Sequence, residues 1–85
     1  MRTVEEIERR LAAIIEEVTL GEKPAAGLAP SMSLMGDIGL DSLDYATTML
    51  NGEEWLGVKV READVDWRSV RTLGDLAALL HRAQS

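Results

Sequence analysis

The residues with the clearest chemical potential in this 85-residue chain are Asp41 and Ser42, which follow a glycine-rich segment and begin an amphipathic one. Aspartate is a preferred helix N-cap, so the pattern predicts that Ser42 is the first residue of a helix. The start of a helix has free backbone N–H groups and a positive dipole end, and both favour a phosphate group. We therefore expect an exposed Ser42 hydroxyl that suits a phosphodiester. An ordinary cap followed by a first-turn serine is the alternative that the spacing leaves open.

Other chemistry has little support from the residue types. Serine is a weak nucleophile without an adjacent base, and the single histidine, His81, lies near the end of the last predicted helix with no partner beside it. The chain has no cysteine, which excludes disulfides, thiolate nucleophiles and cysteine-ligated zinc. Asp37, Asp41 and Asp44 lack the alternating ligands of a calcium-binding loop. We expect a protein that is not an enzyme, binds no metal and is modified at Ser42 by another enzyme.

The charge distribution restricts the partners. The formal net charge is -6, and five acidic residues with no basic residue lie between positions 24 and 58: Asp37, Asp41, Asp44, Glu53 and Glu54. Such a surface repels nucleic acid and anionic membranes, and it attracts basic patches on proteins. The N-terminus lacks the order of a signal peptide, since Glu5, Glu6 and Glu8 interrupt it. We expect a cytoplasmic monomer with protein partners, no nucleic acid and no membrane.

Helical periodicity dominates the chain. It predicts a helix over about 3–18 with a Thr3–Glu6 capping box, a loop over 19–40, and a helix over about 41–56 that Gly57 ends. A short third helix or a turn is expected over about 62–67. A last helix is expected over about 70–83, where Thr72 and Asp75 form a second capping box if positions 70 and 71 precede the helix proper. The fold class is a single all-α domain over 1–85, a small four-helix bundle with a long first loop.

The long loop should pack against the bundle, because apolar residues recur along it. They are Leu28, Met32, Leu34, Met35 and Ile38. Loops of this length usually have a function or packing of their own. The loop also contains four glycines and both prolines, which favour turns over a continuous helix.

The run over 34–44, Leu-Met-Gly-Asp-Ile-Gly-Leu-Asp-Ser-Leu-Asp, resembles the attachment motif of acyl carrier and peptidyl carrier proteins. The matching positions are Leu34, Asp37, Ile38, Gly39, Asp41, Ser42 and Leu43. The segments 53–60 and 70–80 resemble the end of the second helix and the last helix of that family. The resemblance implies a discrete carrier whose Ser42 receives phosphopantetheine from coenzyme A through a phosphopantetheinyl transferase. The arm would hold an acyl, aminoacyl or polyketide group as a thioester for fatty-acid, polyketide or nonribosomal-peptide (antibiotic) synthesis.

The resemblance also implies a recognition surface on the second helix for the transferase, the loading enzyme and the downstream synthase or tailoring enzymes. We expect partner contacts at Asp37, Leu43, Asp44, Ala46, Leu50, Glu53 and Glu54. An apolar stripe beside acidic residues provides a modest, reversible and electrostatically steered contact.

Several positions depart from the family pattern. Thr47 replaces a frequent glutamate, and Thr48 and Gly52 occupy positions where the family often buries leucine, so we expect a local shift of Trp55 or Met49. The segment around Trp67 resembles D-alanine carriers. A helical adaptor without a prosthetic group, and a small hydrolase using Ser42, are the alternative functions.

Overall fold

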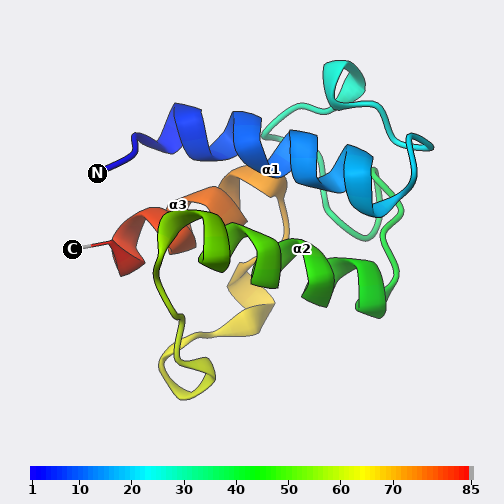
Figure 1. Ribbon diagram of the computed structural model, residues 1–85. Coiled ribbons are helices and arrows are strands. Elements are labelled where there is room, and N and C mark those ends of the chain that lie inside the picture. Colours follow the sequence, from blue (N-terminus) through cyan, green and yellow to red (C-terminus); the bar gives the residue numbers. More distant parts are fainter. Residues whose placement is uncertain (85) are drawn as a thin grey trace.

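The computed structural model describes residues 1–84 and is helical. Its α-helices are α1 (Val4–Val18), α2 (Ser42–Leu56) and α3 (Leu73–Ala83), and its 3-10 turns are η1 (Ala25–Gly27), η2 (Glu62–Asp64) and η3 (Trp67–Ser69). Within residues 1–84, extended pairing is limited to one bridge between Ser33 and Thr72. Helix α2 runs back along α1, so both termini lie at one end of the bundle and the start of α2 at the other (Figure 1). No helix among the described residues is long and apolar enough to span a membrane. The predicted all-α class is confirmed.

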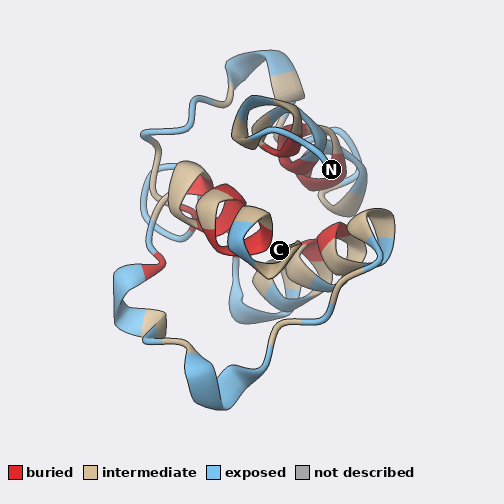
Figure 2. Cartoon of the chain, turned by 90° about the vertical axis from the view of Figure 1, so that its left-hand side faces the viewer, coloured by how far each residue is buried: buried red, intermediate tan, exposed pale blue. Residues whose placement is uncertain are grey.

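The three helices enclose one core. Figure 2 shows the buried residues on the helix faces that point toward the centre of the bundle. The side chains at most 1% exposed include Ile7, Leu11, Ile15, Leu34, Leu73, Leu76 and Leu80. The predicted capping box begins α1: the Glu6 N–H donates to Thr3 Oγ1 (3.2 Å), and the Thr3 N–H donates to Glu6 Oε1 (3.1 Å). The Thr3 backbone bond lowers the pKa of Glu6 below its usual range.

The long loop packs against the bundle, as its apolar residues predicted. The Leu34 N–H donates to the Arg71 carbonyl (2.8 Å), and the Leu73 N–H donates to the Met32 carbonyl (3.0 Å). These bonds fix the loop to the start of α3. Met35 is the exception among the loop residues expected to pack, because it is 54% exposed.

The region after α2 differs from the prediction. The segment 62–67 is not a short α-helix; it contains η2, an extended Val65 and the beginning of η3. Six residues are too few to stabilise an α-helix without strong packing, and Asp66 instead caps η3 by accepting a hydrogen bond from the Arg68 N–H (3.1 Å). The structure is therefore a bundle of three α-helices. The last helix begins at Leu73 rather than at position 70, because the predicted Thr72–Asp75 capping box fixes its start.

Helix α2 packs on α1 and α3 through small residues. Thr48 is fully buried, and a Cβ atom added at Gly52 would lie 3.0 Å from Leu80 Cδ1 and 3.2 Å from Leu11 Cδ2. The helix stays continuous through Gly52. Close backbone approach therefore takes the place of the leucines expected from the family pattern.

Trp55 holds the end of α2 to the N-terminal half of the chain. The guanidinium carbons of Arg2 and Arg10 lie 5.0 Å and 5.5 Å from the centre of its ring. Cation–π contacts at these distances attach the C-terminal end of α2 to α1.

Thr48→Val should stabilise the fold. The Thr48 Oγ1 is buried and has no hydrogen-bond partner within residues 1–84, so valine removes an unpaired polar atom at little change in shape. We expect the free energy of unfolding in urea to rise by about 1 kcal/mol. Thr47→Val is the matched control. The Thr47 hydroxyl donates to the Leu43 carbonyl (2.9 Å), so its loss should not raise the free energy of unfolding. A Thr48→Val variant no more stable than the wild type would contradict this packing.

Acid should weaken the start of α3 through Asp75. The Thr72 and Arg71 N–H groups donate to its carboxylate and lower its pKa below the ordinary 3.8, so the unfolded chain binds the proton more tightly. The stabilisation is present above about pH 3.8 and is lost as the pH falls through the lowered folded pKa.

Melting temperatures measured from about pH 5 to about pH 3 test this. Asp75→Ala should melt lower at pH 5 and converge toward the wild type in acid, whereas Asp64→Asn, at an exposed carboxylate in η2, should run parallel to the wild type. A constant gap between Asp75→Ala and the wild type across this range would show that the Asp75 carboxylate contributes nothing.

Candidate functional site

Ser42 is the first residue of α2 and is exposed, as the sequence predicted. Asp41 is the N-cap: its backbone is extended, and its Oδ1 accepts a hydrogen bond from the Asp44 N–H at 2.7 Å. The cap fixes the first turn, so the hydroxyl of Ser42 is presented at a defined point at one end of the bundle.

The turn before Asp41 requires glycine. Gly39 has φ +86°, a left-handed conformation that other residues rarely adopt. Ile38 and Leu40 on either side are buried, and the Leu40 N–H donates to the Leu34 carbonyl (2.9 Å). This turn fixes the chain in the core immediately before the cap, which explains why the motif combines glycine with flanking apolar residues.

The start of α2 has the donors that a phosphate group needs. The Asp44 N–H is bonded to Asp41 Oδ1 and the Tyr45 N–H to the Asp41 carbonyl, while the N–H groups of Ser42 and Leu43 have no hydrogen bond within residues 1–84. These groups and the positive end of a 15-residue helix favour an anion attached to Ser42. A phosphodiester on this oxygen therefore fits the residues present.

The structure places no histidine at Ser42. His81 lies in the last turn of α3, at the end of the bundle near the termini, whereas Ser42 lies at the opposite end (Figure 1). His81 is therefore not placed to act as a base for Ser42.

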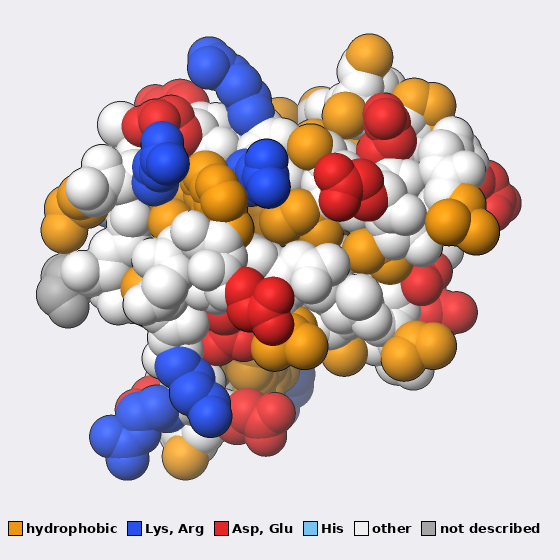
Figure 3. Space-filling view, viewed as in Figure 1, with side chains coloured by type: hydrophobic (Ala, Val, Ile, Leu, Met, Phe, Trp, Pro, Cys, Tyr) orange, Lys and Arg blue, Asp and Glu red, His pale blue; other side chains and the backbone are white. Residues whose placement is uncertain are grey.

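Some of the predicted partner residues are exposed on α2, and others make internal hydrogen bonds. Leu43 is 72% and Leu50 54% exposed, and Ala46 lies between them on the outer face of α2. Figure 3 shows apolar and acidic side chains next to each other across this side of the molecule. Glu54 is exposed and lies one helical turn after Leu50 on α2, and the half-buried Asp44 directly follows Leu43.

Two of the predicted acidic residues make internal hydrogen bonds. The Asp37 carboxylate accepts from the Ser33 N–H (2.9 Å), and the Ser33 hydroxyl accepts from the Asp37 N–H (2.7 Å). The Glu53 carboxylate accepts from the Val60 N–H (2.6 Å). The Asp37 carboxylate therefore shapes the loop before α2, and the Glu53 carboxylate shapes the link that follows the helix.

A family model described as the phosphopantetheine attachment site matches residues 9–80, a range that includes Ser42. This chain belongs to the acyl carrier protein family. It is 38% identical over 82 residues to the meromycolate extension acyl carrier protein of Mycolicibacterium smegmatis, covering 96% of this chain and 79% of that protein. It is 33% identical over 84 residues to the acyl carrier protein of Kineococcus radiotolerans, covering 99% of each.

Membership confirms the family and the non-enzymatic role that the motif predicted. Acyl carrier proteins are non-catalytic and have a covalently attached phosphopantetheine group. When attached, that group supplies a thiol on a flexible chain, and the thiol forms thioesters. The residues of this carrier present and anchor such a group, and they do not react with its cargo.

The sequence did not predict a groove beside α2 in this carrier. The groove has a volume of about 880 Å³ and is lined by Tyr45, Ala46, Met49, Leu50, Glu53, Lys59, Val60, Arg61, Glu62 and Trp67. Burial raises the pKa of Tyr45, which lies half-buried at its wall. The apolar residues of α2 indicated one wall of this groove in the sequence. The other wall is the link over 59–62, whose path depends on the Glu53 bond to Val60 and cannot be predicted from periodicity.

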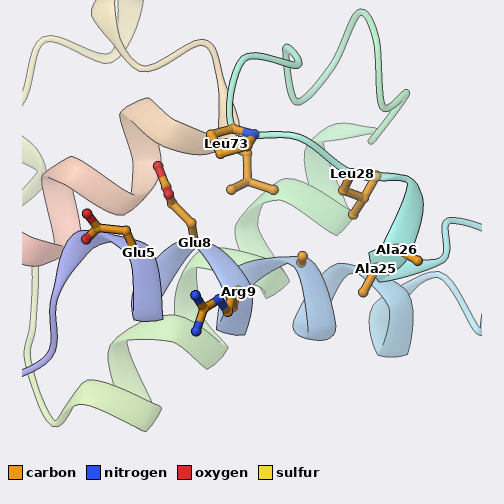
Figure 4. Close-up of a pocket in the computed structure, with 9 residues that line it drawn as sticks. Glu5, Glu8, Arg9, Ala25, Ala26, Leu28 and Leu73 are labelled. Carbon is orange, nitrogen blue, oxygen red and sulfur yellow. The ribbon is translucent and has the colours of Figure 1, made fainter.

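A second hollow of the carrier lies away from Ser42. It has a volume of about 480 Å³ and lies between α1, the region of η1 and the start of α3 (Figure 4). Its walls include Glu8, Arg9, Leu28 and Leu73, and none of its lining residues comes from α2. It is separate from the surface that presents Ser42.

Leu43→Asp and Leu50→Asp should leave the carrier folded and weaken its use by partner enzymes. Both side chains are exposed, so the melting temperature should change little, and an aspartate at position 43 suits the first turn of α2. The rate of arm attachment or of acyl loading should fall several-fold, because the apolar contact is lost. Leu76→Asp, at a fully buried position, is the control that should unfold the domain. Unfolding of either exposed-site variant would show that this face is part of the core.

Proposed function

We propose that Ser42 carries the phosphopantetheine arm and that the thiol of the arm holds an acyl intermediate as a thioester. The observation that carries the proposal is the exposed hydroxyl at the first position of α2, behind the Asp41 cap and beside two free N–H groups. The position of Ser42 within the matched family range supports the same assignment.

Attachment needs a phosphopantetheinyl transferase as well as Ser42. The Ser42 Oγ forms a bond to phosphorus of coenzyme A, the nucleotide portion leaves with the electrons of the broken P–O bond, and the hydroxyl proton goes to a base of the transferase. The free N–H groups of Ser42 and Leu43 and the helix dipole stabilise the negative charge of the resulting phosphodiester.

The outer face of α2 serves the transferase, the loading enzyme and the downstream enzymes in turn. Exposed Leu43, Ala46 and Leu50 provide a small apolar contact, and Asp44 and Glu54 attract basic residues on each partner. Small interfaces with electrostatic steering form quickly and separate readily. A carrier must release each enzyme before it meets the next, so this is the contact that its task requires.

The cargo is an acyl chain built or extended by separate biosynthetic enzymes. The relatives named above are acyl carrier proteins, one of them named for meromycolate extension, and this supports an acyl group over an aminoacyl one. The groove beside α2, lined by Tyr45, Met49 and Trp67, provides apolar surface near the arm along which such a chain can lie.

Intact mass after incubation with coenzyme A and a broad-specificity transferase tests the proposal. The wild type should gain about 340 Da, one phosphopantetheinyl group, and Ser42→Ala should gain nothing. Ser31→Ala, at another exposed serine, is the matched control and should gain the full mass. A gain in Ser42→Ala would refute the assignment. No gain in the wild type with several transferases would favour an adaptor without a prosthetic group.

A further inference from the structure

Helix α1 ends in a motif that demands a left-handed residue. The Gly21 N–H donates to the Glu16 carbonyl (2.8 Å) and the Leu20 N–H to the Glu17 carbonyl (3.1 Å), the paired bonds of a Schellman motif. The residue that directly follows the C-cap Thr19 in this motif, Leu20, has φ +55°. Among residues 1–84 it is the only non-glycine with a positive φ.

Helix α2 ends in the same way with the expected residue. The Val58 N–H donates to the Glu53 carbonyl (3.0 Å) and the Gly57 N–H to the Glu54 carbonyl (3.3 Å), and Gly57 has φ +69°. The left-handed position at the helix end is thus occupied by glycine after α2 and by leucine after α1. A leucine in this conformation is strained, because its Cβ is crowded by the backbone.

Burial does not compensate for the strain at Leu20. Its side chain is 94% exposed, so it contributes almost nothing to the core. Strained residues of this kind cluster at functional sites, so the strain points to a role for the exposed Leu20 side chain.

Leu20 lies at the end of the bundle that presents Ser42. With Lys23, Gly39 and Asp44 it lines a hollow of about 310 Å³ between the end of α1 and the start of α2. Figure 1 shows these two helix ends at the same end of the molecule. Leu43, which directly follows Ser42, is 72% exposed. Exposed leucines from two different elements therefore lie near the serine hydroxyl.

We propose that Leu20 is a contact for the enzyme that attaches the arm, so that the recognition surface includes the end of α1 as well as α2. The inference rests on the proposed function, because an enzyme that modifies Ser42 must close its surface around this end of the bundle. Glu22 and Asp44 line the hollow with Leu20, and among residues 1–84 Lys23 is the one basic residue of its lining. Asp41 lies two residues before Leu43. The partner surface therefore has apolar pockets for Leu20 and Leu43 and a basic rim that pairs with these carboxylates.

Leu20→Gly separates this role from a structural one. Glycine relieves the left-handed strain, so the melting temperature should stay the same or rise by a few degrees. The same change removes the contact, so kcat/KM for arm attachment should fall by at least about fivefold, chiefly through KM. Leu20→Asn is a second variant with the same expected result, because asparagine tolerates this conformation and is polar.

Met1→Gly, made behind an N-terminal tag that supplies the start methionine and that every compared protein carries, is the matched control, because Met1 is 89% exposed and lies at the opposite end of α1. It should be modified at the wild-type rate. Wild-type kcat/KM in both Leu20 variants would overturn the inference. A wild type that sediments as a dimer, and that Leu20→Gly converts to a monomer, would also overturn it, because a second copy of the chain would then cover Leu20. If the wild type gains no arm, or Ser42→Ala does, the proposed function itself fails; a fully modified wild type with unaffected Leu20 variants defeats only the contact.

Discussion

The hydrogen bond from the Asp44 N–H to the Asp41 carboxylate fixes the start of α2, and the presentation of Ser42 depends on this helix start. It begins α2 at Ser42, which is exposed, and the N–H groups of Ser42 and Leu43 have no hydrogen-bond partner among residues 1–84. The left-handed Gly39 supports this cap from the preceding turn. The arm that we propose on Ser42 must move freely while its attachment point stays still, and a capped helix start fixed to the core satisfies both needs.

The bundle divides α2 between two tasks. Thr48 and Gly52 bring its inner face into close contact with α1 and α3, while Leu43, Ala46 and Leu50 remain exposed on the outer face, where we propose that partner enzymes bind. Because the inner face uses small residues, the packing depends on backbone proximity and on the Trp55 contacts with Arg2 and Arg10. The outer face is therefore free to keep apolar residues that the core does not need.

Local rules predicted much of this arrangement. The capping residues Thr3, Asp41 and Thr72 and the stop at Gly57 follow from short-range hydrogen bonding and backbone preference, which a single sequence displays. The segment 62–67 was misjudged, since its helical pattern is too short to outweigh the Asp66 cap and the tertiary position of its neighbours. The Glu53 bond to Val60 depends on the path of the link after α2, which periodicity does not show. The Asp37–Ser33 bonds and the left-handed Leu20 are local, but no preferred residue type marks them in the sequence.

Fragmentation of the intact, arm-bearing protein in a mass spectrometer tests the central claim most directly, because the chain has five serines: Ser31, Ser33, Ser42, Ser69 and Ser85. The capped start of α2 predicts that every fragment containing Ser42 carries the added phosphopantetheinyl mass and that fragments with only the other serines carry none. An arm found on Ser31, Ser33, Ser69 or Ser85, with Ser42 unmodified, would contradict the account.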